Sequence, residues 1–232
     1  MFQALDEAGL RAAGRLAGRW PLLDRIIVKF TDLSSVKLLP LMAVVVFLWF
    51  SACDRERRRA AALVAITGML AAVAVSRSIQ NLSPLHLRPL HSGNPLFVKP
   101  EGVDTTTLEH WSSFPSDHAA VAFALATAVC RASRPLGLLC YVWAVLVVGL
   151  PRIYAGYHYV SDVLAGALIG ILIVGLIWTV LPVRRVVAHA ERLSETYPGL
   201  FGVGLFVLMF WFATMFADVR EIARSLAKHA PG

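Results

Sequence analysis

Long apolar stretches without any Asp, Glu, Lys or Arg constrain the fold of this chain more than any other feature. Five of them contain 16 to 22 residues each: 38–53, 60–76, 135–151, 163–183 and 196–217. A helix needs about 20 mainly apolar residues to cross a lipid bilayer. These stretches therefore predict membrane-spanning helices.

A sixth, shorter stretch completes the pattern. Residues 119–130 are uncharged, and the stretch becomes long enough to span a bilayer if Ser116, Asp117 and His118 form its first turn at the interface. Only 16% of the 232 residues are charged, against about 25% in soluble domains. The sequence thus predicts an all-α polytopic membrane protein with a bundle of six transmembrane helices.

The arginines of the short connections indicate how this bundle is oriented. Lys and Arg accumulate in cytoplasmic loops. Here they gather after the first, third and fifth spans, as Arg55, Arg57, Arg58, Arg59, Arg131, Arg134, Arg184, Arg185 and Arg192. The connections at 77–118 and 152–162 are then extracytoplasmic. We therefore interpret the net charge of +7 as cations that lie beside lipid, and not as a surface that binds nucleic acid.

The two ends of the chain differ from the six-span region at 36–218. Residues 1–35 carry three arginines at intervals of four, which predicts an amphipathic helix lying in the membrane interface. The topology places this basic segment on the extracytoplasmic side, so it either re-enters the bilayer or rests on anionic headgroups. Residues 219–232 are predicted to form a polar tail.

Two clusters of polar and ionisable residues stand at the extracytoplasmic ends of predicted spans, where such residues point to function. The first is Ser112–His118, directly before the third span. Ser and Pro are typical of helix starts, and a helix N-terminus presents unpaired N–H groups that bind phosphate. We expect Ser116, Asp117 and His118 to lie beside such a site.

The second cluster is Arg152–Asp162, at the entry to the fifth span. His158 and Asp162 are four residues apart, so on a helix the carboxylate would accept the Nδ1 hydrogen and leave Nε2 free and basic. A carboxylate orients the catalytic histidine of hydrolases in this way. Arg152 offers a planar fork for phosphate oxygens.

Further cations lie in the connection at 77–118. Arg77 closes the second span and Arg88 follows it, with Lys99 as an additional candidate. Three or four cations, two histidines and a helix N-terminus describe a site for a dianion, and phosphate is the commonest such group. The remaining histidines of this connection are predicted to be solvated loop residues: His86, His91 and His110.

The order of these motifs resembles that of a known enzyme family. Arg-Pro at 88–89, Pro-Ser-x-His at 115–118 and Arg-x5-His-x3-Asp at 152–162 are similar to the motifs of the type 2 phosphatidic acid phosphatase superfamily of membrane lipid phosphatases. The longer forms Ser-Phe-Pro-Ser-Asp-His and Arg-Ile-Tyr-Ala-Gly-Tyr-His-Tyr-x-Ser-Asp resemble its bacterial undecaprenyl-diphosphate phosphatase branch. The resemblance implies a lipid (di)phosphate substrate, a phosphohistidine intermediate, and neither metal nor other cofactor.

By motif position, the resemblance also implies a role for each residue. His158 would attack phosphorus with Asp162 as its orienting partner, and His118 would protonate the leaving oxygen. The residues that bind the phosphate would be Arg152, Arg88, Ser116, Arg77 and Asp117.

The chain departs from the family pattern at three positions. Asn81 stands where the first family motif has Lys, which makes Arg77, about one helical turn earlier, the natural substitute. Pro151 precedes Arg152 where the family often has Ser, so one possible hydroxyl contact is missing. Asp117 replaces a frequent Gly, as it does in the branch named above.

Other functions stay open at this point. A metal hydrolase would use four ligands, Asp117, His118, His158 and Asp162, but the surrounding arginines would repel a metal ion. The three cysteines lie in or beside apolar stretches and are predicted to be packing residues. A lipid phosphate transporter or scramblase would bind the same group without cleaving it.

The substrate and location follow from the motif similarity. Undecaprenyl diphosphate is the first choice, and the alternatives are phosphatidylglycerophosphate, phosphatidic acid, lipid A and phosphoryl transfer to an acceptor other than water. The expected partners are the bilayer and the lipid substrate, with no nucleic acid and no obligatory protein partner. The expected location is the bacterial inner membrane, with the active site facing the periplasm or exterior.

Overall fold

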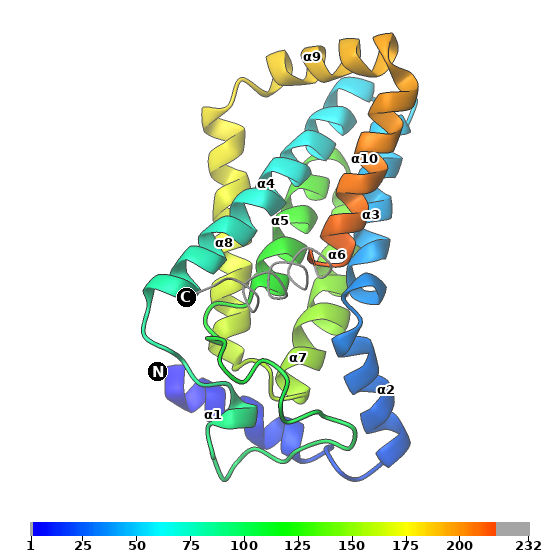
Figure 1. The fold of residues 1–232 in the computed structure, drawn as a ribbon. Coiled ribbons are helices and arrows are strands. Elements are labelled where there is room, and N and C mark those ends of the chain that lie inside the picture. Colours follow the sequence, from blue (N-terminus) through cyan, green and yellow to red (C-terminus); the bar gives the residue numbers. More distant parts are fainter. Residues whose placement is uncertain (1, 217–232) are drawn as a thin grey trace, which may run out of the picture.

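The computed structural model describes residues 2–216, which form a bundle of helices joined by loops (Figure 1). No strand occurs in this part of the chain, so the predicted all-α class is confirmed. The predicted polar tail at 219–232 lies outside the described residues. The helices are α1 (Phe2–Gly14), α2 (Pro21–Asp32), α3 (Ser34–Phe50), α4 (Arg55–Leu82), the short η1 (Pro89–His91), α5 (Asp117–Ala132), α6 (Arg134–Trp143), η2 (Ala144–Gly149), α7 (Leu150–Tyr154), α8 (Val160–Val180), α9 (Val183–Thr196) and α10 (Pro198–Ala213).

Each of the six predicted stretches forms a helix, but not all of these helices are long enough to span a bilayer by themselves. Three helical segments are long and apolar enough to cross, namely α4, the run from α6 to α7, and α8. Two bent pairs, α2 with α3 at 58° and α9 with α10 at 119°, would raise the number to five. The central helix α5 has 16 residues. The count of six crossings therefore stays a prediction.

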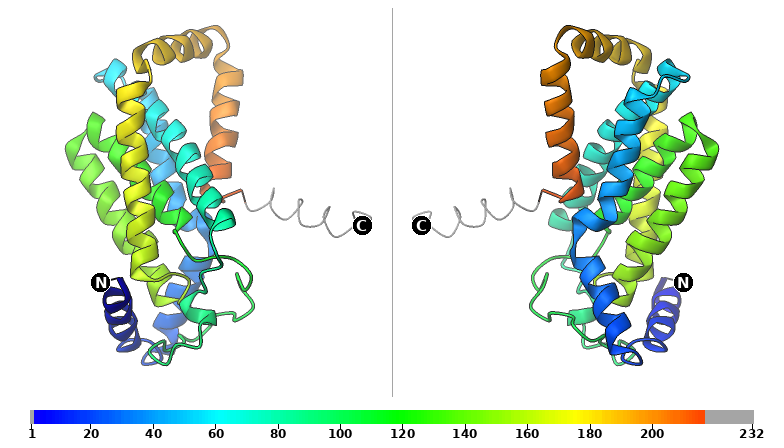
Figure 2. Two further views of the ribbon diagram at one scale, coloured as in Figure 1. Left: turned by 90° about the vertical axis from the view of Figure 1, so that its left-hand side faces the viewer. Right: turned by 90° about the vertical axis from the view of Figure 1, so that its right-hand side faces the viewer.

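The long helices that follow one another in the chain from α3 to α8 run in alternating directions, so their connections separate into two groups (Figures 1 and 2). The arginine-rich connections lie at one end, where α9 runs across the bundle. The loop at 83–116 and the connection at 155–159 lie at the other end. The distribution of arginines predicts the same grouping, and which end faces the cytoplasm stays a prediction.

The N-terminal segment contains two helices, where the sequence predicted one. A left-handed turn at Gly18 (φ 79°) and Pro21 in the first turn of α2 separate α1 from α2. Proline forces the residue before it out of the helical region, and Trp20 is indeed extended. Asp24 fixes this break, because its buried carboxylate accepts hydrogen bonds from the backbone N–H groups of Gly18 and Glu101 and from the hydroxyl of Tyr154.

The core of the bundle is the alanine-rich helix α5, which packs against α4, α6 and α8. Two glycines of α8 permit an unusually close approach. A Cβ atom at Gly166 would lie 2.2 Å from the carbonyl oxygen of Ser116. A Cβ atom at Gly170 would lie 2.3 Å from the carbonyl oxygen of Ala120. The first turns of α5 and α8 are thereby held side by side.

A π-helical turn, η2, interrupts the helical run from Arg134 to Tyr154. It ends two residues before Pro151, whose ring would clash with a carbonyl one α-helical turn earlier and which donates no hydrogen bond. The wider turn accommodates the proline without ending the helix. The chain then continues into α7, which places Arg152 in the interior of the protein.

We predict that Gly170→Ala destabilises the protein by about 1–3 kcal/mol, because the added methyl group would collide with the backbone of α5. The control is Gly175→Ala on the same helix, where a Cβ meets nothing within 4 Å. It should be neutral or stabilising by up to about 1 kcal/mol. Thermal unfolding of the purified variants in detergent measures both effects, and equal melting temperatures would contradict this account of the α5–α8 contact.

Candidate active site

The eight residues that the sequence singled out lie together at the end of the bundle that carries the 83–116 loop. They come from α4, this loop, the start of α5, α7 and the region around the start of α8. Seven of them are buried, and Arg77 is partly exposed. Ionisable groups are rarely buried without partners, so each contact in this cluster matters for the chemistry.

His158 stands in the connection between α7 and α8, and its side chain is fully buried. Its Nδ1 atom lies 2.8 Å from the carbonyl oxygen of Ser113 and 3.5 Å from Oδ2 of Asp162. Because a carbonyl oxygen only accepts hydrogen bonds, Nδ1 carries the ring hydrogen, and Nε2 keeps an unprotonated lone pair that faces a guanidinium nitrogen of Arg88. The sequence predicted Asp162 as the acceptor, whereas the Ser113 carbonyl is the nearer one.

Asp162 joins the starts of two helices as well as facing His158. Its Oδ2 atom accepts the backbone N–H of Tyr159 at 2.8 Å, which caps α8. Its own carbonyl oxygen accepts the N–H of Ser116 at 3.0 Å. Through these bonds Asp162 fixes the position of His158 relative to the first turn of α5.

Arg88 joins the loop at 83–116 to the connection at 155–159 and also reaches His158. Its guanidinium donates to the carbonyl oxygens of Trp111 at 3.2 Å, Ser112 at 3.1 Å and Tyr157 at 2.5 Å. One of its nitrogens, Nη1, is 3.4 Å from Nε2 of His158. Burial and the charge of Arg152 lower the pKa of Arg88 to about 10. Arg88 therefore stays charged at neutral pH, beside the free lone pair.

Arg152 is the most poorly satisfied cation of the cluster. It is 4% exposed, and its Nε atom has no hydrogen-bond partner among the described residues. The guanidinium lies over the ring of Tyr157, 5.7 Å from its centroid. A buried cation without acceptors is unfavourable. An anion with several oxygens bound at this point would remove that cost.

His118 has a different set of partners from His158. Its Nδ1 lies 2.9 Å from Oδ1 of Asp117, whose other oxygen forms an ion pair with Arg77. Its Nε2 lies 3.1 Å from the hydroxyl of Ser34. The carboxylate of Asp117 is therefore occupied by His118 and Arg77. Ser116 caps α5, with its hydroxyl oxygen 3.5 Å from the N–H of Ala119.

The structure adds residues from α3 that sequence reasoning missed. Ser34 contacts His118, and Lys37, one turn later, is fully buried. The Nζ atom of Lys37 donates to the carbonyl of Thr31, and its charge is close enough to interact with Arg152 and Asp117. The available signal was a lysine directly before the charge-free stretch at 38–53, since an ionisable residue at that depth is expensive.

His86 also differs from its prediction as a solvated loop residue. Its side chain is half-exposed, but Nδ1 lies 2.7 Å from the hydroxyl of Ser113 and 3.8 Å from Oδ1 of Asp162. Its ring packs edge-on against those of Phe114 and Tyr159. His86 thus supports the loop segment that contacts His158.

The site places the neutral imidazole of His158 among positively charged side chains. Burial, followed by the charges of Arg152 and Arg88, holds the pKa of His158 well below its ordinary value, so the ring is neutral at pH 7. Residues 2–216 contain no group of three or more His, Cys, Asp or Glu side chains that could hold a metal ion. The arrangement is suited to a covalent reaction with an anionic group.

Comparison with known proteins identifies the family. The model of the PAP2 superfamily matches residues 92–185. The putative undecaprenyl-diphosphatase YbjG of Escherichia coli (strain K12) is 36% identical over 151 residues, which cover 62% of this chain and 68% of YbjG. This chain belongs to the PAP2 superfamily. Undecaprenyl-diphosphatase BcrC of Bacillus subtilis (strain 168) is 26% identical over 157 residues, 68% of this chain and 74% of BcrC.

Two crystal structures of PAP2-like proteins have a similar fold. The transmembrane PAP2 type phosphatidylglycerolphosphate phosphatase of Bacillus subtilis aligns with a TM-score of 0.51 and 25% identity, over 76% of this chain and 84% of that protein. LpxE of Aquifex aeolicus aligns with a TM-score of 0.50 and 28% identity, over 73% and 92%. The resemblance predicted from the motifs is confirmed, and this PAP2 protein is a multi-pass membrane lipid phosphatase.

We predict that Arg88→Lys loosens the catalytic loop, because a single ammonium group on a flexible stem does not replace a guanidinium that binds three carbonyls. Amide hydrogen exchange, followed by mass spectrometry in detergent, should accelerate at 111–113 and 157–158. The control is Arg152→Lys, because the Nε of Arg152 has no hydrogen-bond partner among the described residues. Equal acceleration in both variants would contradict the clamping role of Arg88.

Proposed function

We propose that this PAP2 phosphatase converts undecaprenyl diphosphate to undecaprenyl phosphate through a phosphohistidine on His158, without a metal ion. The observation that carries the proposal is the unprotonated Nε2 of His158, 3.4 Å from the buried guanidinium of Arg88 and close enough to Arg152, whose Nε lacks a partner among the described residues, to interact with its charge. A nucleophile surrounded by cations attracts a phosphate and stabilises the charge that builds on its oxygens.

In the first step, Nε2 of His158 attacks the terminal phosphorus in line. The bond to the bridging oxygen breaks, and His118 gives its Nε2 proton to the departing lipid phosphate. The carboxylate of Asp117, 2.9 Å from Nδ1 of His118, stabilises the protonated ring before the transfer. In the second step His118 takes a proton from water, which attacks the phosphohistidine and releases inorganic phosphate.

The phosphate oxygens would be held by several donors during both steps. Arg152 supplies its unsatisfied Nε, and Arg88 supplies the N–H groups that its carbonyl contacts leave over. Ser116 stands at the N-terminus of α5, where backbone N–H groups and the helix dipole favour an anion. Arg77 acts less directly, because it is paired with Asp117.

The choice of undecaprenyl diphosphate is supported by the two relatives named as undecaprenyl-diphosphatases. The structural similarity to a phosphatidylglycerolphosphate phosphatase favours the main alternative. Phosphate release by the purified protein should be compared for undecaprenyl diphosphate, phosphatidylglycerophosphate, phosphatidic acid and lipid A. We expect kcat/KM to be at least tenfold higher for undecaprenyl diphosphate, and equal values would overturn the assignment.

The proposed orientation places the active site on the extracytoplasmic side of the bacterial inner membrane. The arginines at the opposite end of the bundle support it, since such residues accumulate on the cytoplasmic side. A lipid diphosphate with its chain in the outer leaflet would then present its phosphate at the level where α5 and α8 begin.

His158→Ala should abolish phosphate release, a loss of at least about 10³-fold, with the fold retained. His118→Ala should lower kcat by about 10²- to 10⁴-fold. The matched control is His110→Ala in the exposed part of the loop, which should keep full activity. A transporter would be indicated instead if the wild type released no phosphate and His158→Ala still moved lipid across the membrane. Inactivation by EDTA that added metal reverses would contradict the metal-free reaction.

In the pH profile of kcat/KM, the midpoint of the acid limb should lie below pH 6.5. His158 must be unprotonated to attack, and its pKa is held below the ordinary value of about 6.5, so activity is lost only as the pH falls through that lowered pKa. Arg152→Gln removes one of the charges responsible and should shift the limb upward. This shift separates His158 from the ionisation of the substrate, which the substitution does not change. An unchanged limb would contradict the assignment.

A further inference from the structure

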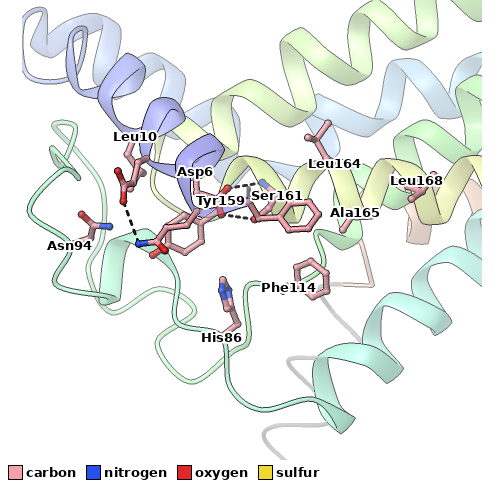
Figure 3. Close-up of a pocket in the computed structure, with 13 residues that line it drawn as sticks. Asp6, Leu10, His86, Asn94, Phe114, Tyr159, Ser161, Leu164, Ala165 and Leu168 are labelled. Atoms are coloured by element: carbon pink, nitrogen blue, oxygen red, sulfur yellow. Dashed lines mark hydrogen bonds between the residues drawn. The ribbon is translucent and has the colours of Figure 1, made fainter.

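The helix α1 is anchored to the start of α8 by two specific contacts. The carboxylate of Asp6 accepts the backbone N–H and the hydroxyl of Ser161, both at 2.8 Å (Figure 3). The Ser161 N–H belongs to the first turn of α8, where donors lack partners within the helix and a negative charge is favoured. At Gly9, a Cβ atom would lie 2.3 Å from Cγ2 of Val160, so glycine permits α1 to approach closely.

A cavity of about 620 Å³ lies beside these anchors, between α1, α8 and the catalytic loop. Leu164, Ala165 and Leu168 of α8 line its apolar side together with Phe114, as Figure 3 shows, and Asn94 lies at the far end. Leu164 and Leu168 are more than half exposed in the protein itself. Their side of α8 therefore faces the hydrocarbon of the bilayer, so the cavity opens toward lipid.

The same cavity reaches the surroundings of His158. His86 lines it and contacts the hydroxyl of Ser113 at 2.7 Å, while the carbonyl of Ser113 accepts the Nδ1 hydrogen of His158 at 2.8 Å. Phe114 and Tyr159, which also line it, directly follow Ser113 and His158 in the chain. A molecule in the cavity would thus lie one layer of side chains away from the nucleophile.

We propose that this cavity binds the part of the substrate's hydrocarbon chain that adjoins the phosphate, with α1 as one wall. The proposal rests on the proposed function, because it requires a lipid phosphate at His158. The volume falls in the range of about 300–1,000 Å³ that is typical of small-ligand sites, which is enough for a segment of the chain.

The charges of the cavity determine which end of the lipid enters. Asp6 and Glu7 on α1 are both engaged, with Ser161 and with Arg11 respectively. Their negative charge repels a phosphate, whereas Arg88 and Arg152 around His158 attract one. The phosphate is therefore directed to the cationic cluster and only the chain enters the cavity. In this way α1 becomes part of substrate selection.

Filling the cavity tests the proposal. Leu168→Trp should raise KM for undecaprenyl diphosphate at least tenfold with kcat little changed, and should alter KM for isopentenyl diphosphate, which has five carbons, less than twofold. The matched control is Leu172→Trp, which is as exposed on α8 (60% against 56%) but does not line the cavity. Equal effects on both substrates, or no effect on either, would overturn the proposal.

Releasing α1 provides a second test. Asp6→Asn weakens the contacts with Ser161 and should raise KM for the long substrate in the same selective way as Leu168→Trp. Arg11→Gln is the control, because the exposed side chain of Arg11 pairs with Glu7 of its own helix and does not line the cavity. A loss that is equal for the long and the short substrate would show a merely structural role for α1.

A binding measurement separates this proposal from the proposed function. Undecaprenyl phosphate should protect Leu168→Cys, but not Leu172→Cys, from maleimide labelling measured at each site by mass spectrometry. Protection without release of phosphate from undecaprenyl diphosphate would retain the chain site and refute the proposed reaction. Phosphate release without protection would refute the chain site and retain the reaction.

Discussion

The close contact between α5 and α8 is the constraint on which the rest of the site depends. Gly166 and Gly170 allow the two helices to pack backbone against backbone, so that their first turns start at the same level. The bond from the N–H of Ser116 to the carbonyl of Asp162 is possible only at this separation. His118 and His158, which are 40 residues apart in the chain, are brought into one cluster of buried residues as a result. The groups of the candidate site are thus positioned by packing in the apolar part of the bundle.

The second principle of the site is an excess of buried positive charge. Arg88, Arg152 and Lys37 are buried around His158, where Asp117 and Asp162 are the buried acids. Burying charges is costly unless partners compensate them, and Arg152 lacks an acceptor for its Nε among the described residues. Three buried cations against two buried carboxylates leave a surplus of positive charge, which a bound anion would compensate. In the proposed reaction, this compensation would help to hold the phosphate for attack.

The sequence predicted what depends on local spacing, and it missed what depends on approach between distant segments. Charge-free stretches located the helices of the bundle, and three motifs named residues that the structure brings together. The Ser113 carbonyl as partner of His158, and Ser34 and Lys37 beside the site, could not be read from spacing because they arise where α3 and a loop backbone meet α5 and α7. The break between α1 and α2 was missed because arginines at intervals of four suggested one continuous helix, although Gly18 and Pro21 interrupt it.

The imidazole rings of His158 and His118 have different hydrogen-bond acceptors, and these match the different roles proposed for the two rings. Nδ1 of His158 rests first on a neutral backbone carbonyl, whereas Nδ1 of His118 rests on a carboxylate. A carboxylate stabilises an imidazolium better than a carbonyl does, which supports the proposal that His118 is the proton donor and His158 the nucleophile. If both proposed roles hold, the acceptor behind each ring gives the reaction its direction, and the two histidines could exchange roles only by exchanging these acceptors.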